Sequence, residues 1–273
     1  MKVTRHYYGN LDDQFGDLRI PNSEGPHPVA VVIHGGYWMS DVKLETIAGL
    51  AESLTKKGIA TWNIEYRRVG QAGGGWPGTF TDVALATDYL PELAKSANLD
   101  LNRVVTIGHS AGGHLALWLA GRHRLPEDSE IKTSPSPFAV QGAISLAGVV
   151  DLSLMDEVLS ISENVLQTKF NPVQGFIGGS PVEVPERYEQ GSPIQLLPLG
   201  VPQVLIHGAL DVTIPIGISQ NYKKVADSMN EKVNLVEIAS AEHFKLIDPN
   251  SDAWPVILKE TLALLEEKIE SKL

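Results

Sequence analysis

The residue types best suited to chemistry gather around Ser110, in the run Gly-His-Ser-Ala-Gly at 108–112. This run follows an apolar segment at 103–108 and precedes a segment rich in alanine and leucine at 111–121. A serine in a tight turn between a strand and a helix needs small residues two positions away on either side, because larger side chains would collide there. The spacing predicts Ser110 as a nucleophile toward an activated acyl group. The alternative is a surface serine in a glycine-rich turn.

A serine nucleophile needs a general base, and the chain has eight histidines to supply it. His243 follows a predicted strand at 233–238 and precedes the last predicted helix. Loops beyond the carboxyl ends of strands are where ligands bind in open α/β sheets. His109 is expected to point into the packing between sheet and helix, and His34 and His207 to close strands as structural residues. His243 is therefore the predicted base.

The base in turn needs a carboxylate to orient it. Asp211 follows a predicted strand at 201–207 and lies in a loop before a helix, which makes it the favoured acid. Asp151, which follows the predicted strand at 138–146, is the second candidate. For both residues the alternative role is that of a solvated helix cap.

The run His-Gly-Gly-Tyr-Trp at 34–38 directly follows another predicted strand. Glycines let the backbone approach a substrate oxygen closely, so the N–H groups of Gly36, Tyr37 and Ala111 are the predicted oxyanion hole. The alternative is a tight turn whose glycines serve packing alone. Three large aromatic residues flank these loops and are expected to line the substrate pocket, with simple packing as the alternative; they are Trp38, Trp76 and Phe244.

Short apolar runs alternate with longer helical patterns over most of the chain. The predicted strands lie at 28–34, 59–64, 103–108, 138–146, 201–207 and 233–238, and the predicted helices at 43–57, 79–97, 111–121, 216–229 and 252–272. This alternation predicts an α/β fold with a mostly parallel central sheet flanked by helices on both faces. Short strands at 5–8 and 16–20 precede it and are expected to form an antiparallel edge.

The segment at 148–200 interrupts this alternation. It is rich in Pro, Gly, Ser and Glu and has a short helical pattern at 155–166. A segment of this length without strand patterns is best interpreted as a cap-like insertion. We therefore expect one domain over 1–273, with a cap or lid at 148–200 inside it.

The composition excludes several classes of function. The 273 residues are 43% hydrophobic and 20% charged, as in ordinary globular proteins, and the net charge of −11 disfavours nucleic acid and anionic membrane surfaces as partners. The chain has no cysteine, which excludes disulfides, thiolate metal sites and a cysteine nucleophile. No run is long enough to span a membrane and no signal-peptide pattern is found, so a cytoplasmic protein is expected. The oligomeric state stays open, with a dimer as one alternative.

These motifs together resemble the α/β-hydrolases, in the branch of small esterases, lipases and arylformamidases. The run at 34–38 is similar to the HGGYW signature of kynurenine formamidases and to the HGGG signature of esterases like hormone-sensitive lipase. The run Gly-His-Ser-Ala-Gly-Gly-His at 108–114 resembles the GHSAGGH motif of this branch, and the loops at 207–215 and 242–244 resemble its acid and histidine loops. The resemblance extends from about Tyr8 to the last helix and is weakest over 148–200.

The resemblance implies an α/β-hydrolase fold with catalytic residues in the chain order Ser110, Asp211, His243. It also implies a small-molecule acyl substrate, an acyl-enzyme intermediate and no cofactor. Tyr37 stands where the HGGG pattern has its third glycine, which is a departure from the lipase-like group.

Three functions remain open from the sequence. The first is a carboxylesterase for small or aryl esters, and the second is an arylformamidase acting on N-formylkynurenine, favoured by the Tyr-Trp pair at 37–38. The third is a non-catalytic, ligand-binding member of the fold, against which the complete serine, acid and histidine set argues.

Overall fold

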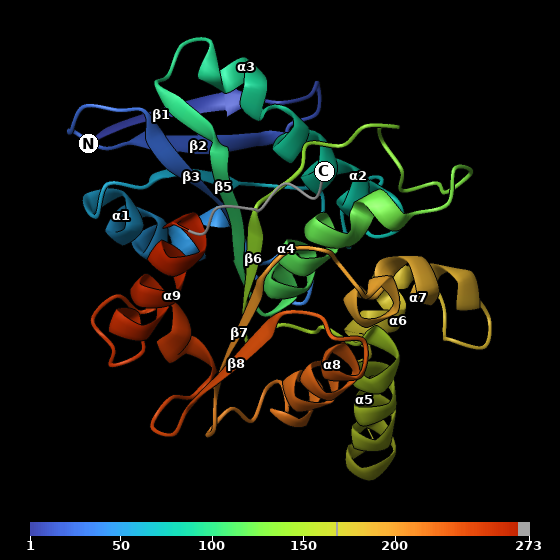
Figure 1. The fold of residues 1–273 in the computed structure, drawn as a ribbon. Coiled ribbons are helices and arrows are strands. Elements are labelled where there is room, and N and C mark those ends of the chain that lie inside the picture. The colour runs from blue at the N-terminus through green and yellow to red at the C-terminus, as the bar shows by residue number, and fades with distance from the viewer. Residues whose placement is uncertain (168, 267–273) are drawn as a thin grey trace.

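A single twisted sheet runs through the middle of the computed structural model, which describes residues 1–167 and 169–266 (Figure 1). Within that range the sheet has eight strands in the order β1-β2-β4-β3-β5-β6-β7-β8. The strands are β1 (Lys2–Tyr7), β2 (Phe15–Ile20), β3 (His27–Ile33), β4 (Ala60–Ile64), β5 (Leu99–His109), β6 (Gly142–Leu146), β7 (Gln203–Gly208) and β8 (Val233–Ile238). In this order, neighbouring strands from β4 through β3 to β8 pair in parallel. Strand β2 pairs antiparallel with both β1 and β4. The predicted α/β class and the antiparallel edge are confirmed.

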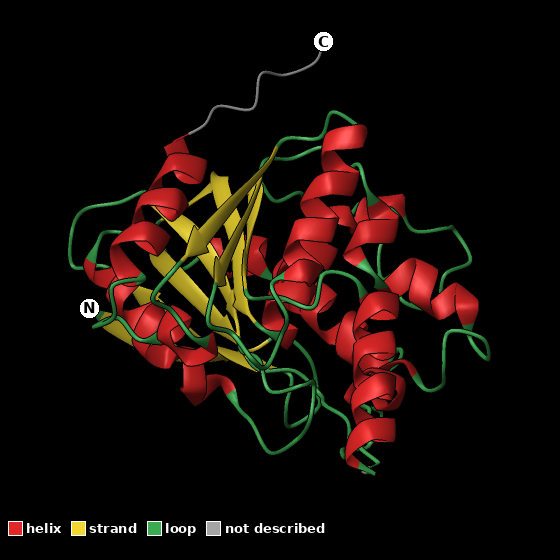
Figure 2. Ribbon diagram, turned by 90° about the horizontal axis from the view of Figure 1, so that it is seen from below, coloured by secondary structure: helices red, strands yellow, loops and turns green. Residues whose placement is uncertain are grey.

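Helices cover both faces of the sheet (Figure 2). They are α1 (Ala48–Lys56), α2 (Gly78–Asp88), α3 (Leu90–Ala94), α4 (Ala111–Gly121), α5 (Leu152–Leu166), α6 (Pro172–Ile177), α7 (Pro185–Gly191), α8 (Gly217–Ser228) and α9 (Trp254–Glu266). Short 3₁₀ turns lie at η1 (Leu44–Ile47), η2 (Arg122–Arg124), η3 (Pro193–Leu196) and η4 (His243–Ile247). None of the helices in the described ranges is long and apolar enough to cross a membrane.

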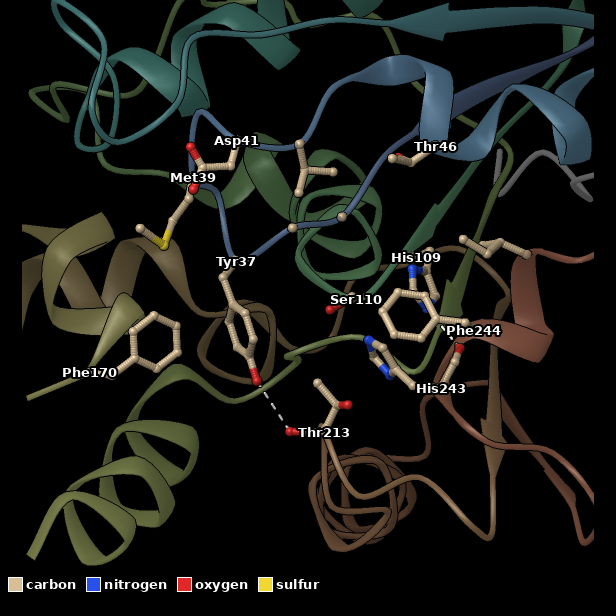
Figure 3. Close-up of a pocket in the computed structure, with 14 residues that line it drawn as sticks. Tyr37, Met39, Asp41, Thr46, His109, Ser110, Phe170, Thr213, His243 and Phe244 are labelled. Carbon is tan, nitrogen blue, oxygen red and sulfur yellow. Dashed lines mark hydrogen bonds between the residues drawn. The ribbon is translucent and has the colours of Figure 1, made fainter. Parts of the chain in front are cut away.

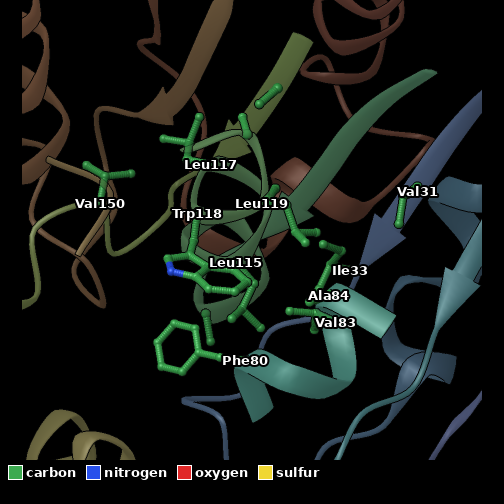
Figure 4. Packing of buried hydrophobic residues seen from close by; sticks show 14 of the residues in the cluster. Val31, Ile33, Phe80, Val83, Ala84, Leu115, Leu117, Trp118, Leu119 and Val150 are labelled. Carbon is green, nitrogen blue, oxygen red and sulfur yellow. The ribbon is translucent and has the colours of Figure 1, made fainter. Parts of the chain in front are cut away.

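Each central strand contributes side chains to two separate hydrophobic cores, because successive side chains of a strand point to opposite faces. In β3, Val31 and Ile33 belong to the core on the side of α2 and α4, whereas Val32 packs on the side of α1 and α9. Figure 4 shows Ile33 beside Val83 and Ala84 of α2, with Phe80 of that helix next to Trp118 of α4. A strand buried on both faces explains the continuous apolar run at 28–34.

Several predicted elements have different boundaries in the structure. The predicted helix at 79–97 divides into α2 and α3 close to Pro91, which lacks the N–H that a continuous helix needs. The predicted helix at 43–57 begins as the 3₁₀ turn η1. The predicted helix at 252–272 is described as far as Glu266, and its last residues lie outside the described ranges.

The predicted strand at 138–146 is shorter in the structure because side chains bind its first backbone groups. The N–H of Phe138 donates to Asp88 Oδ1 at 2.8 Å, and its carbonyl accepts from Arg122 at 3.3 Å. These backbone groups are therefore not available for the sheet, and β6 begins at Gly142.

The segment at 148–200 lies between β6 and β7 and contains α5, α6, α7 and η3. Asp151 begins α5 as its N-cap, with Oδ1 accepting from the N–H of Leu154 at 3.0 Å. Asp151 is therefore a helix cap, which was its alternative role. Whether the segment acts as a cap over a substrate stays a prediction.

The turn from β5 into α4 is possible only because both flanking glycines lack a side chain. A Cβ added to Gly108 would lie 2.0 Å from the carbonyl oxygen of Gly112, and one added to Gly112 would lie 2.1 Å from that of Ile33 in β3. Both clashes involve backbone atoms of packed strands and helices, which cannot move without disturbing the sheet.

We expect Gly112→Ala to destabilise the protein by at least about 1–3 kcal/mol, as is typical of overpacking. Thermal unfolding should show a Tm lower by about 2–4 °C for each kcal/mol. The matched control is Gly217→Ala at the start of α8, where no atom lies within 4 Å of the added Cβ. Equal Tm values for the two variants would contradict the clash.

Candidate active site

The candidate residues converge because they follow strands whose carboxyl ends share one edge of the sheet. Ser110 follows β5, Asp211 follows β7 and His243 follows β8, while Gly36 and Tyr37 follow β3. Strands β3 and β5 are direct neighbours in the sheet, as are β7 and β8. Parallel pairing therefore brings together loops that are far apart in sequence, at the edge where ligands bind in such sheets.

Ser110 lies in a strained backbone conformation at the tip of its turn. Its φ of 55° and ψ of −121° belong to a region that residues with a side chain rarely adopt. The strain is held by the neighbouring strand, since the N–H of Ser110 donates to the carbonyl of Leu146 at 2.8 Å. The side chain thereby stands between β5 and the N-terminus of α4, at the carboxyl edge of the sheet.

The carboxylate of Asp211 is buried and accepts hydrogen bonds at both oxygens. His243 Nδ1 donates to Oδ2 at 2.6 Å, and the N–H groups of Thr213 and Ile214 donate to Oδ1 at 2.8 and 2.9 Å. His207 Nε2 lies 3.5 Å from Oδ2. Burial by itself raises the pKa of Asp211, but the hydrogen bonds from His207, His243 and the backbone outweigh it and hold this pKa well below its ordinary value of 3.8. Asp211 is therefore an anion beside His243 at neutral pH.

Ser110 and His243 line the same cavity, of about 420 Å³. Figure 3 shows the hydroxyl oxygen of Ser110 on the side of the His243 ring. Because Nδ1 of His243 donates to Asp211, its Nε2 is the nitrogen left for a proton from a hydroxyl group. Two of the three predicted side chains thus line one cavity, and the third, Asp211, lies behind His243 and is bound to its Nδ1. Asp151, the second acid candidate, instead caps α5 and contacts Asn221 at 3.3 Å.

The loop after β3 has an unusual backbone that leaves its amide groups open. Gly36, Tyr37 and Trp38 have φ values of 104°, 51° and 56°. Within the described residues, the N–H groups of Gly36 and Tyr37 make no backbone hydrogen bond, and both residues line the cavity. Successive N–H groups in such a left-handed turn form a concavity that suits an anion.

A buried network behind the loop holds this backbone. His34 Nδ1 lies 2.8 Å from the carbonyl oxygen of Gly35, and its Nε2 lies 2.8 Å from Glu65 Oε1. Arg68 contacts Glu65 at 3.3 Å and Asp13 at 2.8 Å. With the Gly35 carbonyl bound on the His34 side, the N–H of the same peptide group points the opposite way. His34 is buried and structural, as expected, and it orients the loop that carries the predicted oxyanion hole.

Only one of the three predicted pocket aromatics lines the cavity. Phe244 does so and is 61% exposed. Trp38 is fully buried instead, stacked on Phe176 with ring centroids 4.3 Å apart. Trp76 lines a different cavity, where its Nε1 donates to Glu130 at 2.8 Å. The two tryptophans therefore serve packing, which was the alternative to lining the pocket. The turn after Gly36 directs the side chain of Trp38 into the core, and Trp76 lies in the loop before α2, away from the catalytic cavity.

Sequence reasoning missed the position of His109. Its ring lines the cavity rather than the interior packing, and its Nε2 lies 2.9 Å from the carbonyl oxygen of His243. The rings of His109 and His243 have centroids 4.4 Å apart. Its place next to Ser110 was visible in the sequence, but the direction of its ring depends on the loop after β8. Burial lowers the pKa of His109 to about 3, and the nearby His243 contributes in the same direction.

Other wall residues of the cavity carried no sequence signal. They are Met39, Asp41, Val42, Thr46, Phe170, Thr213 and Ile247. In the described part of the chain, no three His, Asp or Glu side chains are grouped to hold a metal ion. The chemistry that the arrangement supports is proton transfer and nucleophilic attack by protein side chains.

We expect His109 to stay neutral, with its proton on Nε2, from pH 8 to pH 5. Its folded pKa of about 3 lies below the ordinary value of 6.5, so the unfolded chain binds a proton in this range that the folded chain does not. This group therefore lowers the stability by about 1.4 kcal/mol for each pH unit as the pH falls from 6.5 toward 3. Long-range ¹H–¹⁵N NMR spectra would follow the ring, and His109→Gln would assign its signal. A midpoint between pH 6 and 7 would contradict the burial of this ring.

Comparison with known proteins identifies a family for most of the chain. Residues 17–225 match the BD-FAE family. The chain is 24% identical to an isoprenylcysteine alpha-carbonyl methylesterase of Arabidopsis thaliana, over 88% of this chain and 56% of that protein. It is 23% identical to a kynurenine formamidase of Danio rerio, over 94% of this chain and 80% of that protein. The chain thus spans little more than half of the plant relative.

Solved structures share the fold over nearly the whole chain. A truncated carbohydrate esterase from gut microbiota has a TM-score of 0.78 at 20% identity, covering 97% of both chains. Esterase 2 of Thermogutta terrifontis with bound propionate has a TM-score of 0.74 at 20% identity, covering 98% of this chain and 97% of that one. The fold is that of the α/β-hydrolases, and the chain belongs to the BD-FAE family of esterases within that superfamily.

Proposed function

We propose that this chain is a serine carboxylesterase that cleaves a small carboxylic ester through an acyl-enzyme, with Ser110, His243 and Asp211 as its catalytic residues. The observation that carries the proposal is the 2.6 Å hydrogen bond from His243 to the buried Asp211, at a cavity that Ser110 also lines. An oriented imidazole beside a strained serine is the arrangement that activates a hydroxyl group.

In the proposed reaction, Ser110 Oγ attacks the ester carbonyl while His243 Nε2 takes its proton. The carbonyl oxygen becomes an anion that the N–H groups of Gly36, Tyr37 and Ala111 stabilise, each donor contributing about 2.7–4 kcal/mol. Asp211 keeps the other ring nitrogen protonated and stabilises the imidazolium. His243 then protonates the departing alkoxide, which leaves as the alcohol and completes the acyl-enzyme. Water repeats the sequence on the acyl group, releasing the acid and restoring Ser110.

The walls of the cavity support a small acyl substrate with an apolar part. Several apolar side chains line it: Met39, Val42, Phe170, Phe244 and Ile247. Phe170 comes from the segment at 148–200 and contacts the ring of Tyr37, with centroids 5.8 Å apart. We therefore propose that this segment closes one side of the acyl pocket as a cap. The propionate bound to the related Thermogutta terrifontis esterase is an acyl ligand of a size that suits this cavity.

A second candidate function is an arylformamidase acting on N-formylkynurenine. The observation that favours it is the similarity to the Danio rerio kynurenine formamidase, over 80% of that protein's length. Steady-state assays on p-nitrophenyl acetate and on N-formylkynurenine separate the two functions. A kcat/KM at least 10-fold higher for N-formylkynurenine would favour the formamidase, and the reverse order would favour the esterase.

We expect a fluorophosphonate probe to label the wild-type chain at Ser110, because an activated serine attacks phosphorus as it attacks a carbonyl. Ser110→Ala should abolish labelling and lower kcat on p-nitrophenyl acetate by at least about 10³-fold. Intact-mass spectrometry measures the adduct, and circular dichroism shows that the variant is folded. A folded wild type without labelling or hydrolysis would favour the third function, a non-catalytic ligand-binding member of the fold.

We expect Asp211→Asn to lower kcat by about 10²–10⁴-fold with a smaller change in KM, because the amide no longer fixes the protonation and orientation of His243. The matched control is Asp151→Asn, since Asp151 caps α5 and does not contact His243. Its kcat should stay within about 3-fold of the wild type. Equal losses in the two variants would remove Asp211 from the catalytic set.

A further inference from the structure

His109 has one ring nitrogen that the described structure leaves without a partner. The residue is 4% exposed and lines the cavity beside Ser110. Its Nε2 makes the hydrogen bond to the carbonyl of His243, whereas Nδ1 makes none within the described residues. Because this nitrogen is not fully buried, a water molecule or a ligand in the cavity can bind it.

The hydrogen bond at Nε2 of His109 determines whether Nδ1 carries a proton. The carbonyl oxygen of His243 can only accept a hydrogen bond, so Nε2 of His109 carries the proton and donates. A neutral imidazole has one N–H, so Nδ1 keeps its lone pair and is an acceptor. Burial keeps the ring neutral, since its pKa is lowered to about 3. The group that binds Nδ1 must therefore donate a hydrogen bond.

Gly35 packs closely against His109 and Ser110. A Cβ added at Gly35 would lie 3.4 Å from His109 Nδ1, 3.0 Å from the Cβ of Ser110 and 2.7 Å from the carbonyl oxygen of His109. Any side chain there would collide with the backbone of His109 and with Ser110. Its absence lets the loop after β3 pack directly against the turn that carries Ser110, at the wall of the cavity that Gly35 also lines.

One further acceptor lines the same side of the cavity as His109. Figure 3 shows Thr46 on the side of His109, whereas Asp41 lies beside Met39, away from His109. The hydroxyl of Thr46 donates to the carbonyl of Lys43 at 2.8 Å, so its oxygen is left to accept.

We propose that His109 Nδ1 binds a hydroxyl group of the substrate, so that the enzyme prefers esters that carry an uncharged hydroxyl group close to the ester bond. This inference rests on the proposed esterase function and assigns the substrate class of the same cavity. His109 thereby has two roles, as a positioning residue for His243 through Nε2 and as a substrate-binding residue through Nδ1.

Two substitutions separate these roles. The amide nitrogen of glutamine reaches the position of Nε2, so His109→Gln keeps a donor toward the His243 carbonyl and removes the acceptor at Nδ1. Asparagine is shorter and places its amide oxygen near the position of Nδ1, so His109→Asn keeps an acceptor and removes the donor. The readout is the ratio of kcat/KM between a hydroxyl substrate and its methoxy counterpart. Comparing this ratio among variants cancels the intrinsic reactivity of each ester.

Two substrate pairs cover both sides of the ester bond. The alcohol side is tested with 2-hydroxyethyl and 2-methoxyethyl acetate, and the acyl side with the p-nitrophenyl esters of glycolate and methoxyacetate. In one of the two pairs, we expect the wild-type ratio to exceed that of His109→Gln by about 10-fold, the effect of one hydrogen bond in a buried site. His109→Asn should keep most of the wild-type ratio while its rates on both members fall together.

The controls distinguish failure of this inference from failure of the esterase function. The matched control is His123→Gln in the 3₁₀ turn η2, away from the catalytic cavity, which should keep both the wild-type rates and the wild-type ratio. If the wild type hydrolyses p-nitrophenyl acetate but His109→Gln keeps the wild-type ratio in both pairs, the role of Nδ1 is refuted and the esterase function stands. If the folded wild type hydrolyses no ester and takes up no fluorophosphonate, both proposals fail.

Discussion

The carboxylate of Asp211 is the group on which the rest of the site depends. It is taken out of water between the loops after β7 and β8, where it accepts from two backbone N–H groups and from the ring of His243, and the ring of His207 lies 3.5 Å away. A buried charge is tolerated only when its hydrogen bonds offset the lost hydration. The hydrogen bonds to Asp211 therefore determine how the loops after β7 and β8 pack against each other, and they orient the ring of His243.

The second constraint is backbone strain in the turn at Ser110 and in the loop after β3, which packed neighbours hold in place. Ser110, Tyr37 and Trp38 all have positive φ values, a conformation that residues with side chains adopt at a cost of about 1–3 kcal/mol each. Packed neighbours fix their positions. The carbonyl of Leu146 in β6 accepts from the N–H of Ser110, and the ring of Trp38 stacks on that of Phe176. Binding sites formed on packed elements hold their geometry better than sites on free loops.

The sequence allowed prediction of those parts of the site that follow from local rules. Ser110, Asp211 and His243 were identifiable because each stands just beyond a strand, and strand ends meet at one edge of a parallel sheet. The glycines beside Ser110 predicted a tight turn for the same local reason. The directions of Trp38 and His109 were not predictable, because a stacking partner in α6 decides the first and the loop after β8 decides the second. Phe170 had no signal either, since the segment at 148–200 lacks a regular pattern.

The network behind the loop after β3 links two distant regions of the molecule. Arg68 bridges Glu65, which holds His34, and Asp13, which lies in the turn between β1 and β2. The antiparallel edge formed by the first 20 residues is thus tied by charge to the peptide groups of the proposed oxyanion hole. Shortening the chain at its amino end would remove an anchor of the proposed catalytic site, although no residue of that edge lines the cavity.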